Sequence, residues 1–276
     1  MSVALIIAPY DCGRRNQRMG AGALELAEAC RSTLKGLDVT EIEVDADDGF
    51  PVEIGTGFRV CREIACHVAQ AHSDGHFPVV LAGNCLAAIG AAAGIRADGV
   101  VWFDQHGDLN RPETSLSGML DGMPFAILLG RAWNALASTV PGFAPVDEAR
   151  AILVDGRDLD PDEQEFLKHS ALRHVATASA AAAVREVSEA GAKRVYCHID
   201  LDVHDPATLR VNAFATNGGP DPLTLRCAVA GVMTAAPVQA VTLCSYDPAH
   251  DPDARVPPVA ATLLRCLVEA REGKIC

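Results

Sequence analysis

The sequence GVVWFDQHGD, at residues 99–108, combines the pattern of a buried strand with the pattern of a metal site. Its first half is an apolar run, and its second half carries Asp104, His106 and Asp108 at alternate positions. Successive side chains of an extended chain point to opposite faces, so these three side chains are predicted to project to one side. A row of strong ligands at the end of a strand indicates a metal site.

A second row of ligands follows another apolar run, in VYCHIDLD at residues 195–202, where Asp200 and Asp202 share a face. A single motif of this kind is more often a turn or a helix cap than a metal site. Two such rows at strand ends are different, because their carboxylates would repel one another strongly without a cation between them. Four carboxylates and an imidazole are enough to hold two divalent cations, which predicts a two-metal hydrolytic site.

The composition favours a small-molecule enzyme. The chain has 276 residues, 49% of them hydrophobic, and we expect one α/β domain over residues 1–276. Its 23 basic and 36 acidic residues give a net charge of −13, which argues against binding to nucleic acid or to an anionic membrane surface. A small polar or cationic substrate fits this charge better.

The ten cysteines are scattered through predicted helices and strands rather than spaced as a disulfide framework. The N-terminal apolar run has no preceding positive charge, unlike a secretory signal, and no apolar stretch has transmembrane length. We therefore expect a cytoplasmic protein with reduced thiols.

Short β-branched runs alternate with helical patterns from end to end, which predicts a doubly wound parallel sheet of eight strands. The predicted strands are 3–8, 37–44, 78–82, 99–104, 151–155, 173–176, 194–200 and 239–245. The predicted helices are 21–34, 58–71, 86–94, 124–129, 161–168, 178–190, 222–235 and 259–271. All strands of a parallel sheet end at one edge, where both rows of ligands are expected to meet.

A third candidate lies at the same edge, in LAGNCL at residues 81–86. Cys85 follows a predicted strand through a turn of small residues. Free cysteines are among the most buried residue types, which favours a structural role. A thiol close to two cations would instead lose its proton and bind metal, and position alone leaves both interpretations open.

Three motifs together resemble the arginase and agmatinase family of ureohydrolases. The sequence D-Q-H-G-D from Asp104 is similar to the family's D-A-H-x-D, D-L-D-V-H-D-P from Asp200 is similar to D-x-D-x-x-D-P, and A-G-N-C from Ala82 stands where the family has G-G-D-H. The resemblance covers nearly the whole chain in the same order. It implies a three-layer αβα fold with a parallel eight-stranded sheet and a site for two Mn²⁺ ions.

The resemblance also implies the ligands of each ion. One manganese would be held by Cys85, Asp104, Asp108 and Asp200, and the other by His106, Asp104, Asp200 and Asp202. A hydroxide bridging the two ions would attack the guanidine carbon. Asp108 would orient this hydroxide and help to move its proton to the leaving nitrogen.

An amino-acid substrate is implied by two further stretches. Asn110, Ser115 and Ser117 match positions that bind an α-carboxylate in arginases, while Asp158 and Asp160 match the stretch that recognises the α-amino group. The alternative is that Asn110 and Ser117 are turn residues and that Asp160 caps the helix beginning at Pro161.

Three positions depart from the family pattern, all near the expected reaction centre. Cys85 replaces a histidine ligand, Asp121 replaces the histidine that moves protons, and Ser245 replaces the glutamate that faces the substrate guanidinium. A guanidinium cation pairs best with a carboxylate. An N-hydroxyguanidine is less basic and carries a hydroxyl to which Ser245 can hydrogen-bond, so we expect hydrolysis of Nω-hydroxy-L-arginine to hydroxyurea and L-ornithine.

Other interpretations remain open from the sequence. The substrate could be that of another ureohydrolase, of the arginase, formiminoglutamase or guanidinobutyrase type. Agmatine fits less well, because it lacks the carboxylate that the amino-acid contacts would bind. A metal-free binding protein that has lost catalysis is a further alternative.

The chain stops soon after its last predicted helix, without the tail through which animal arginases form trimers, which favours a monomer. His198 and His204 flank the second motif and suit either packing on the sheet or the orientation of a carboxylate.

Overall fold

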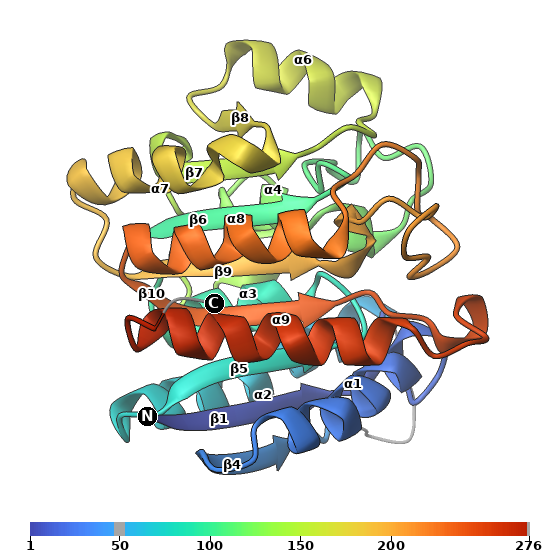
Figure 1. The fold of residues 1–276 in the computed structure, drawn as a ribbon. Coiled ribbons are helices and arrows are strands. Elements are labelled where there is room, and N and C mark those ends of the chain that lie inside the picture. The colour runs from blue at the N-terminus through green and yellow to red at the C-terminus, as the bar shows by residue number, and fades with distance from the viewer. Residues whose placement is uncertain (47–52, 275–276) are drawn as a thin grey trace.

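The computed structural model describes residues 1–46 and 53–274 and has the three layers of an α/β/α fold (Figure 1). The middle layer is a sheet of eight parallel strands in the order β4-β1-β5-β10-β9-β6-β7-β8. The strands are β1 (Ser2–Ala8), β4 (Asp38–Glu43), β5 (Phe77–Ala82), β6 (Gly99–Asp104), β7 (Ala151–Asp155), β8 (Arg173–Val175), β9 (Val195–Asp200) and β10 (Val238–Cys244). The predicted fold class is therefore confirmed.

Helices cover both faces of the sheet. The face seen in Figure 1 is covered by α1 (Met19–Thr33), α7 (Ala180–Glu189), α8 (Pro222–Ala235) and α9 (Val256–Arg271). The other face is covered by α2 (Glu53–Ser73), α3 (Ala87–Gly94) and α4 (Pro124–Leu128). Two further helices, α5 (Asn134–Ala137) and α6 (Pro161–His169), also contribute residues to the core on this side.

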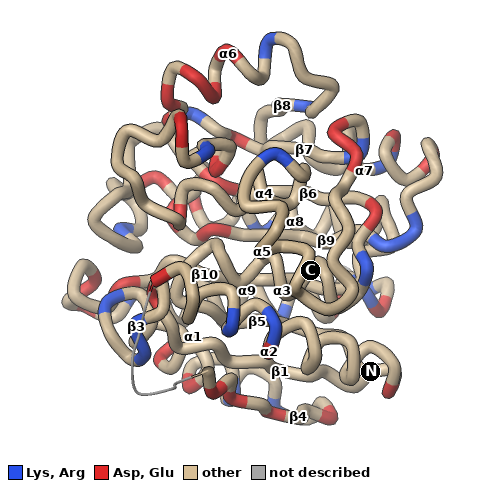
Figure 2. Tube along the Cα trace, turned by 180° about the vertical axis from the view of Figure 1, so that it is seen from behind, with Lys and Arg blue, Asp and Glu red and all other residues tan. Residues whose placement is uncertain are grey.

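The two cores follow from the alternation of side chains along each strand. In β1, Val3, Leu5 and Ile7 belong to the core beneath α1 and α9, while Ile6 and Ala8 belong to the core beneath α2 and α3. A strand buried on both faces has to be apolar at successive positions, as parallel strands generally are. Accordingly, β5 and β10 at the centre of the sheet carry no charged residue and appear tan in Figure 2.

All eight predicted strands are present, with each end within one residue of its prediction. The largest difference among the helices is that α2 begins at Glu53 rather than at residue 58. Its first five residues contain two glycines, which weaken a helical pattern, yet Thr56 and Gly57 are buried there by tertiary packing. The hairpin of β2 (Tyr10–Asp11) with β3 (Arg14–Arg15) and the single turn of α5 were not predicted, because each is too short to show a periodicity.

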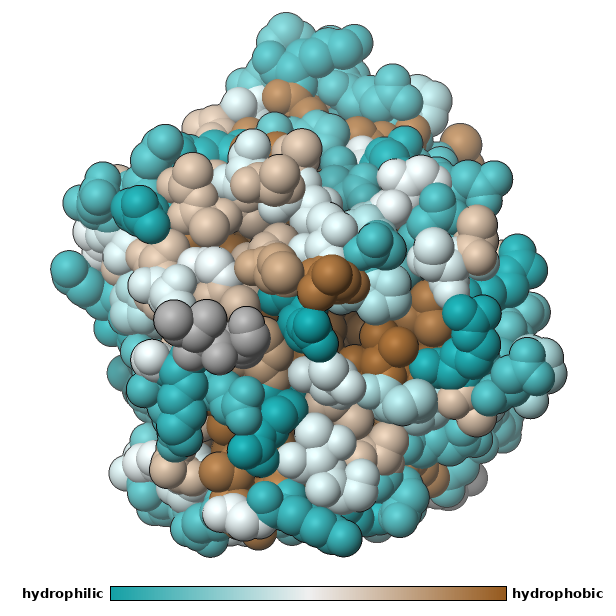
Figure 3. All heavy atoms as spheres, viewed as in Figure 1, coloured by the Kyte–Doolittle hydropathy of each residue, from teal (hydrophilic) through white to brown (hydrophobic). Residues whose placement is uncertain are grey.

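The outer surface is mixed in polarity. Figure 3 shows hydrophilic residues mainly around the edge of this face and residues of intermediate hydropathy over much of its centre, with an apolar hollow between the first turns of α8 and α9. Leu223, Val259 and Leu263 line this hollow. No helix within the described residues is long and apolar enough to cross a membrane.

Eight cysteines of the described residues are free, as expected for reduced thiols. Cys266, on α9, is the exception, because the structure places it in a disulfide. The expectation of thiols alone was therefore wrong at this position, where the sequence shows only a cysteine on the apolar side of a helix.

Candidate metal centre and substrate pocket

Four neighbouring strands place the predicted site at their carboxyl ends. Strands β5, β10, β9 and β6 are adjacent in the sheet, although β5 and β6 are consecutive along the sequence. Cys85 follows β5, Asp104 ends β6, Asp200 ends β9 and Ser245 follows β10. These residues meet because β10 and β9 lie between β5 and β6 in the sheet. Ligands commonly bind in α/β folds at such a point, where consecutive strands are separated in the sheet.

The turn after β5 brings the chain close to its neighbours. A Cβ added to Gly83 would lie 2.1 Å from the carbonyl oxygen of Tyr10 and 2.8 Å from backbone atoms of Gly20. Only glycine fits this approach. The backbone can therefore turn sharply enough to present Cys85 to the sheet edge.

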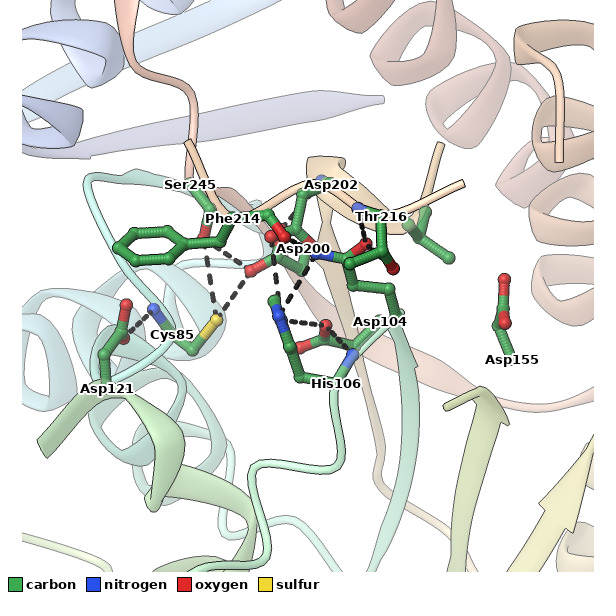
Figure 4. A network of polar contacts seen from close by, with 12 residues as sticks. Cys85, Asp104, His106, Asp121, Asp155, Asp200, Asp202, Phe214, Thr216 and Ser245 are labelled. Carbon is green, nitrogen blue, oxygen red and sulfur yellow. Dashed lines mark hydrogen bonds and ion pairs between the residues drawn. The ribbon is translucent and has the colours of Figure 1, made fainter. Parts of the chain in front are cut away.

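One group of potential ligands is formed by Asp104, His106 and Asp202. Nδ1 of His106 lies 3.4 Å from Oδ1 of Asp104 and 3.7 Å from Oδ2 of Asp202 (Figure 4). The carboxylate of Asp104 is held in place by two donors: the indole N–H of Trp102 at 3.1 Å and the backbone N–H of His106 at 2.7 Å. The pairing of β6 with β9 thus brings the two predicted rows of ligands together.

A second group is formed by Cys85, Asp104 and Asp108. Asp200 adjoins this group, because Sγ of Cys85 donates to its Oδ2 at 2.9 Å. Asp200 also accepts the backbone N–H of Asp202 through Oδ1 at 2.8 Å. The six residues predicted to bind metal therefore lie in one continuous cluster.

Burial and like charge make this cluster electrostatically strained without a cation. Burial raises the pKa of Asp104, Asp108 and Asp200, and repulsion from neighbouring carboxylates raises it further. Burial lowers the pKa of His106, but the carboxylates of Asp202 and Asp104 outweigh this effect and raise it to about 11. The same negative potential attracts a divalent cation, which would replace the bound protons.

Two oxygen atoms of the cluster have no hydrogen-bond partner among the described residues. They are Oδ2 of Asp108 and Oδ1 of Asp202, both inaccessible to solvent. Buried polar atoms are normally paired, so unpaired carboxylate oxygens at a cluster of acids indicate the positions of missing cations. The donor set therefore fits a pair of divalent ions.

Two residues of the candidate centre have a strained backbone conformation. Asp108 and Ser245 have φ angles of 52° and 69°, in the left-handed region that L-residues rarely adopt. Such strain persists only where the surroundings impose it, and it is common at functional sites. Asp108 and Ser245 are two of the nine non-glycine residues with positive φ in the described chain, and both border the candidate centre.

Asp121 lies next to Cys85 at the wall of the pocket (Figure 4). Its Oδ1 accepts the backbone N–H of Cys85 at 2.9 Å. Burial raises the pKa of Asp121 to about 8, and repulsion from Asp11 adds to the shift. The predicted position of Asp121 beside the cluster agrees with the geometry.

A pocket of about 290 Å³ opens above the cluster. Its walls include five of the six predicted metal ligands, all except Asp104. Asn110, Ser117, Asp158 and Asp160 also line it, as does Ser245, whereas Ser115 is not among the lining residues. Oγ of Ser115 instead accepts the backbone N–H of Gly118 at 3.0 Å and lies 3.4 Å from Oγ of Ser117.

The helix cap predicted as the alternative role of Asp160 is also present. Asp160 and Glu163 form a capping box at the start of α6, and Asn110 donates to Oδ2 of Asp160 at 2.8 Å. Glu163 was missed by the sequence analysis, although the spacing of Asp160, Pro161 and Glu163 is a capping signal. It lines the pocket, accepts the backbone N–H of Leu109 at 2.8 Å, and has its pKa raised to about 7 by burial.

Gln105 joins the ligand row to the opposite wall of the pocket. Its Oε1 accepts from the backbone N–H of Thr216 at 2.7 Å and from Arg157 at 3.1 Å. Its Nε2 donates to the carbonyl oxygen of Phe214 at 2.9 Å, and Phe214 lines the pocket (Figure 4). One amide thus connects three segments of the site.

Asn212 is a second residue that the sequence analysis missed. Its buried amide donates to Oδ2 of Asp202 at 3.1 Å and to the carbonyl oxygen of Ser245 at 2.9 Å, and its Oδ1 accepts the backbone N–H of Phe214 at 2.9 Å. It lies in an irregular segment where no periodicity marks a functional position. Its contacts orient a ligand rather than bind metal directly.

The Asn212→Ala variant is expected to bind its second divalent ion roughly 10- to 100-fold more weakly, because Asp202 loses the donor that orients it. Calorimetric titration of the metal-free protein with a divalent ion would measure this effect. Asn217→Ala, at an exposed position of the same segment, is the control. Equal affinities in Asn212→Ala and the wild type would show that Asn212 does not orient the ligand.

The parallel sheet and the buried ligand groups at its carboxyl edge are those of a metal-dependent α/β hydrolase. The sequence model of the Arginase family matches residues 1–269. The arginase of Bacillus caldovelox is 30% identical over 237 residues, which cover 74% of this chain and 77% of that protein. The chain therefore belongs to the arginase family, and it is a hydrolase that acts on linear amidines.

Solved structures agree with this fold. The arginase of Bacillus subtilis superposes with a TM-score of 0.87 at 24% identity, covering 97% of this chain and 98% of that one. The formimidoylglutamase of Bacillus subtilis superposes with a TM-score of 0.76 at 15% identity, covering 99% of this chain and 88% of that one. Members of this family generally depend on a pair of metal ions, in agreement with the ligand groups described above.

Proposed function

We propose that this ureohydrolase is a manganese-dependent amidinohydrolase that converts Nω-hydroxy-L-arginine to hydroxyurea and L-ornithine. The observation that carries this proposal is Ser245, a neutral hydroxyl at the position where the family resemblance implies a guanidinium-binding glutamate. Ser245 lines the pocket beside Asp200 and Cys85, so its side chain borders the reaction centre.

The donor set supports manganese as the metal pair, since four of the six proposed ligands are carboxylates, whose oxygen atoms manganese prefers. Cys85, Asp104, Asp108 and Asp200 would hold one ion, and His106, Asp104, Asp200 and Asp202 the other. When bound, such a pair lowers the pKa of water enough to supply a nucleophile at neutral pH.

The chain itself supplies the groups that move protons. Asp108 borders the pocket, and its carboxylate can orient the nucleophile and accept a proton from it. Asp121 borders the same pocket on the side of Cys85. We assign to Asp121 the relay of a proton to the leaving nitrogen, the role that a histidine has in the family pattern.

The substrate's reacting end is selected by charge. A guanidinium cation would lose the charge-assisted pair that a glutamate provides. The electron-withdrawing oxygen of an N-hydroxyguanidine makes this group less basic, and its added hydroxyl needs a hydrogen-bond partner. The hydroxyl of Ser245 donates a hydrogen bond to Asp200 at 2.5 Å. Its oxygen keeps lone pairs that can accept a hydrogen bond from the substrate hydroxyl.

The far end of the pocket suits an amino-acid head. Asp158 and Asp160 provide negative charge for an α-amino group, while Asn110 and Ser117 provide neutral donors for an α-carboxylate. The pocket volume of about 290 Å³ is close to that of other small-molecule sites. Ser115 would act on the carboxylate indirectly, because its hydroxyl contacts that of Ser117.

The three substituted positions, Cys85, Asp121 and Ser245, are similar to those of the Nω-hydroxy-L-arginine amidinohydrolase of D-cycloserine biosynthesis. This resemblance supports a place in the biosynthesis of that antibiotic. The alternative is another ureohydrolase activity, of which arginase is favoured by the names of the relatives.

Hydrolysis of Nω-hydroxy-L-arginine, L-arginine and agmatine by the manganese-loaded protein tests the proposal, with ornithine or putrescine measured as the product. We expect selective turnover of the hydroxylated substrate. A higher kcat/KM for L-arginine would identify an arginase with unusual ligands, and the interpretation of Ser245 would then be wrong.

A further inference from the structure

Two buried side chains that the proposed reaction does not use, His198 and Cys244, meet two that line the pocket, Cys85 and Asp200. We call this group the thiol cluster: Cys85, His198, Asp200 and Cys244. Their potential ligand atoms all lie within 4.8 Å of one another, and none of the four residues is more than 3% exposed. Cys244 stands opposite Asp200 in the register of β10 with β9, so the sheet itself brings the cluster together.

The distances within the thiol cluster match those of a tetrahedral metal site. Sγ of Cys85 lies 3.7 Å from Sγ of Cys244, which lies 3.5 Å from Nε2 of His198. Around a tetrahedral zinc, with Zn–S of about 2.3 Å and Zn–N of about 2.0–2.1 Å, two sulfurs are about 3.7–3.8 Å apart and a sulfur and a nitrogen about 3.5–3.6 Å. Oδ2 of Asp200 lies 2.9 Å from the sulfur of Cys85 and 4.0 Å from the sulfur of Cys244. One of these distances is shorter and the other longer than the separations expected around the ion.

His198 is held in the orientation that such a site requires. Its ring stacks on the indole of Trp102, with centroids 3.7 Å apart and an interplanar angle of 19°. Nδ1 lies 3.2 Å from the hydroxyl of Tyr196, which can accept a hydrogen bond from Nδ1–H. The lone pair of Nε2 is then left on the side of Cys244. Metal-binding histidines generally use their second nitrogen in this way.

We propose that the thiol cluster is a distinct binding site for a borderline-soft divalent cation, with zinc as the metal that its donors suit best. Two thiols, an imidazole and one carboxylate are a typical zinc donor set, whereas manganese prefers oxygen ligands. The thiols release their protons to solvent when the cation binds. His198 and Cys244 belong to neither proposed manganese ligand set.

The two kinds of site exclude one another, because both use Cys85 and Asp200. A zinc ion in the thiol cluster withdraws these two ligands from the first manganese position. The occupancy of the cluster therefore controls whether the binuclear centre can assemble. This regulatory consequence rests on the proposed function, while zinc binding itself does not.

Metal-free protein, kept reduced with a phosphine and given one equivalent of Zn²⁺, tests the site by X-ray absorption spectroscopy. We expect zinc with two sulfur ligands and one imidazole. Zinc with one sulfur ligand or none would overturn the proposal. This measurement needs no variant and so does not depend on the stability of a mutant.

The Cys244→Ala variant tests the same site by affinity. We expect zinc binding to weaken at least tenfold. The matched control is Cys197→Ala, which removes a buried thiol on the opposite face of the sheet and should leave zinc affinity unchanged. Equal zinc affinity in Cys244→Ala and wild type would also overturn the proposal.

A competition experiment tests the regulatory consequence. One equivalent of Zn²⁺ should suppress manganese-dependent hydrolysis of Nω-hydroxy-L-arginine in the wild type and have a smaller effect in Cys244→Ala. Equal suppression in both proteins would overturn control through this cluster. If the manganese-loaded protein hydrolysed no hydroxyarginine at all, the proposed function would fail, and the sulfur count at zinc would still decide the existence of the site.

Discussion

The Ser245→Glu variant is expected to shift the ratio of kcat/KM values toward L-arginine over Nω-hydroxy-L-arginine by roughly 10- to 100-fold. A carboxylate at this position gains a charge-assisted pair with guanidinium, which contributes about 1.5–3 kcal/mol. The hydroxylated substrate loses its hydroxyl partner and gains no cationic pairing. The backbone strain at Ser245 should not change, because serine and glutamate both carry a Cβ at φ 69°.

Two control variants separate the contributions at this position. Ser245→Gln has the size of the glutamate without its charge. Ser245→Ala removes the hydroxyl, with its hydrogen bond to Asp200 and its contacts to the sulfurs of Cys85 and Cys244. We expect neither control to improve the hydrolysis of L-arginine. Competition between the two substrates in one reaction gives the ratio directly, and the same ratio in Ser245→Glu as in wild type would mean that selection lies elsewhere in the pocket.

The Cys85→Ser variant is expected to lose about 100-fold in affinity for one of its two manganese ions and to lose activity in parallel. Serine can keep the hydrogen bond to Asp200, so the fold should be preserved. A hydroxyl, however, does not ionise as a thiol does beside a cation and is a much poorer ligand. Metal content after gel filtration and manganese-dependent turnover measure the two effects.

Cys85→His and Cys197→Ser complete this comparison. Histidine restores the ligand that the family pattern has at this position, and we expect it to retain two manganese ions. Cys197→Ser changes a buried thiol away from the site, so it reports any general effect of the substitution. Two tightly bound ions and full activity in Cys85→Ser would remove Cys85 from the ligand set.

The sheet was predictable because its strands are short apolar runs separated by helical patterns. β6 and β9, for example, each end at an acidic residue that breaks the apolar run, which marks the strand end in the sequence itself. The start of α2 was not predictable, since its first turn is stabilised by packing against distant residues such as Leu86 rather than by a local pattern.

The candidate site divides in the same way. Asp104, His106 and Asp108 could be assigned from their alternation, and they do join the ligand cluster, although β6 ends at Asp104 and the other two lie in the irregular segment beyond it. Asn212 and Cys244 could not, since their contacts depend on which strands become neighbours. The sequence places β10 last among the strands, but the fold inserts it beside β5 at the centre of the sheet.

The amide of Gln105 has a consequence for movement of the pocket wall. Phe214, on the wall of the pocket, and the nearby Thr216 are both hydrogen-bonded to this side chain, which stands between Asp104 and His106 in the sequence. Outward movement of that wall has to break these bonds or pull on the strand end that carries both ligands. Movement of the segment at Phe214 is therefore coupled to the alignment of the metal ligands through two side chains, those of Gln105 and Asn212.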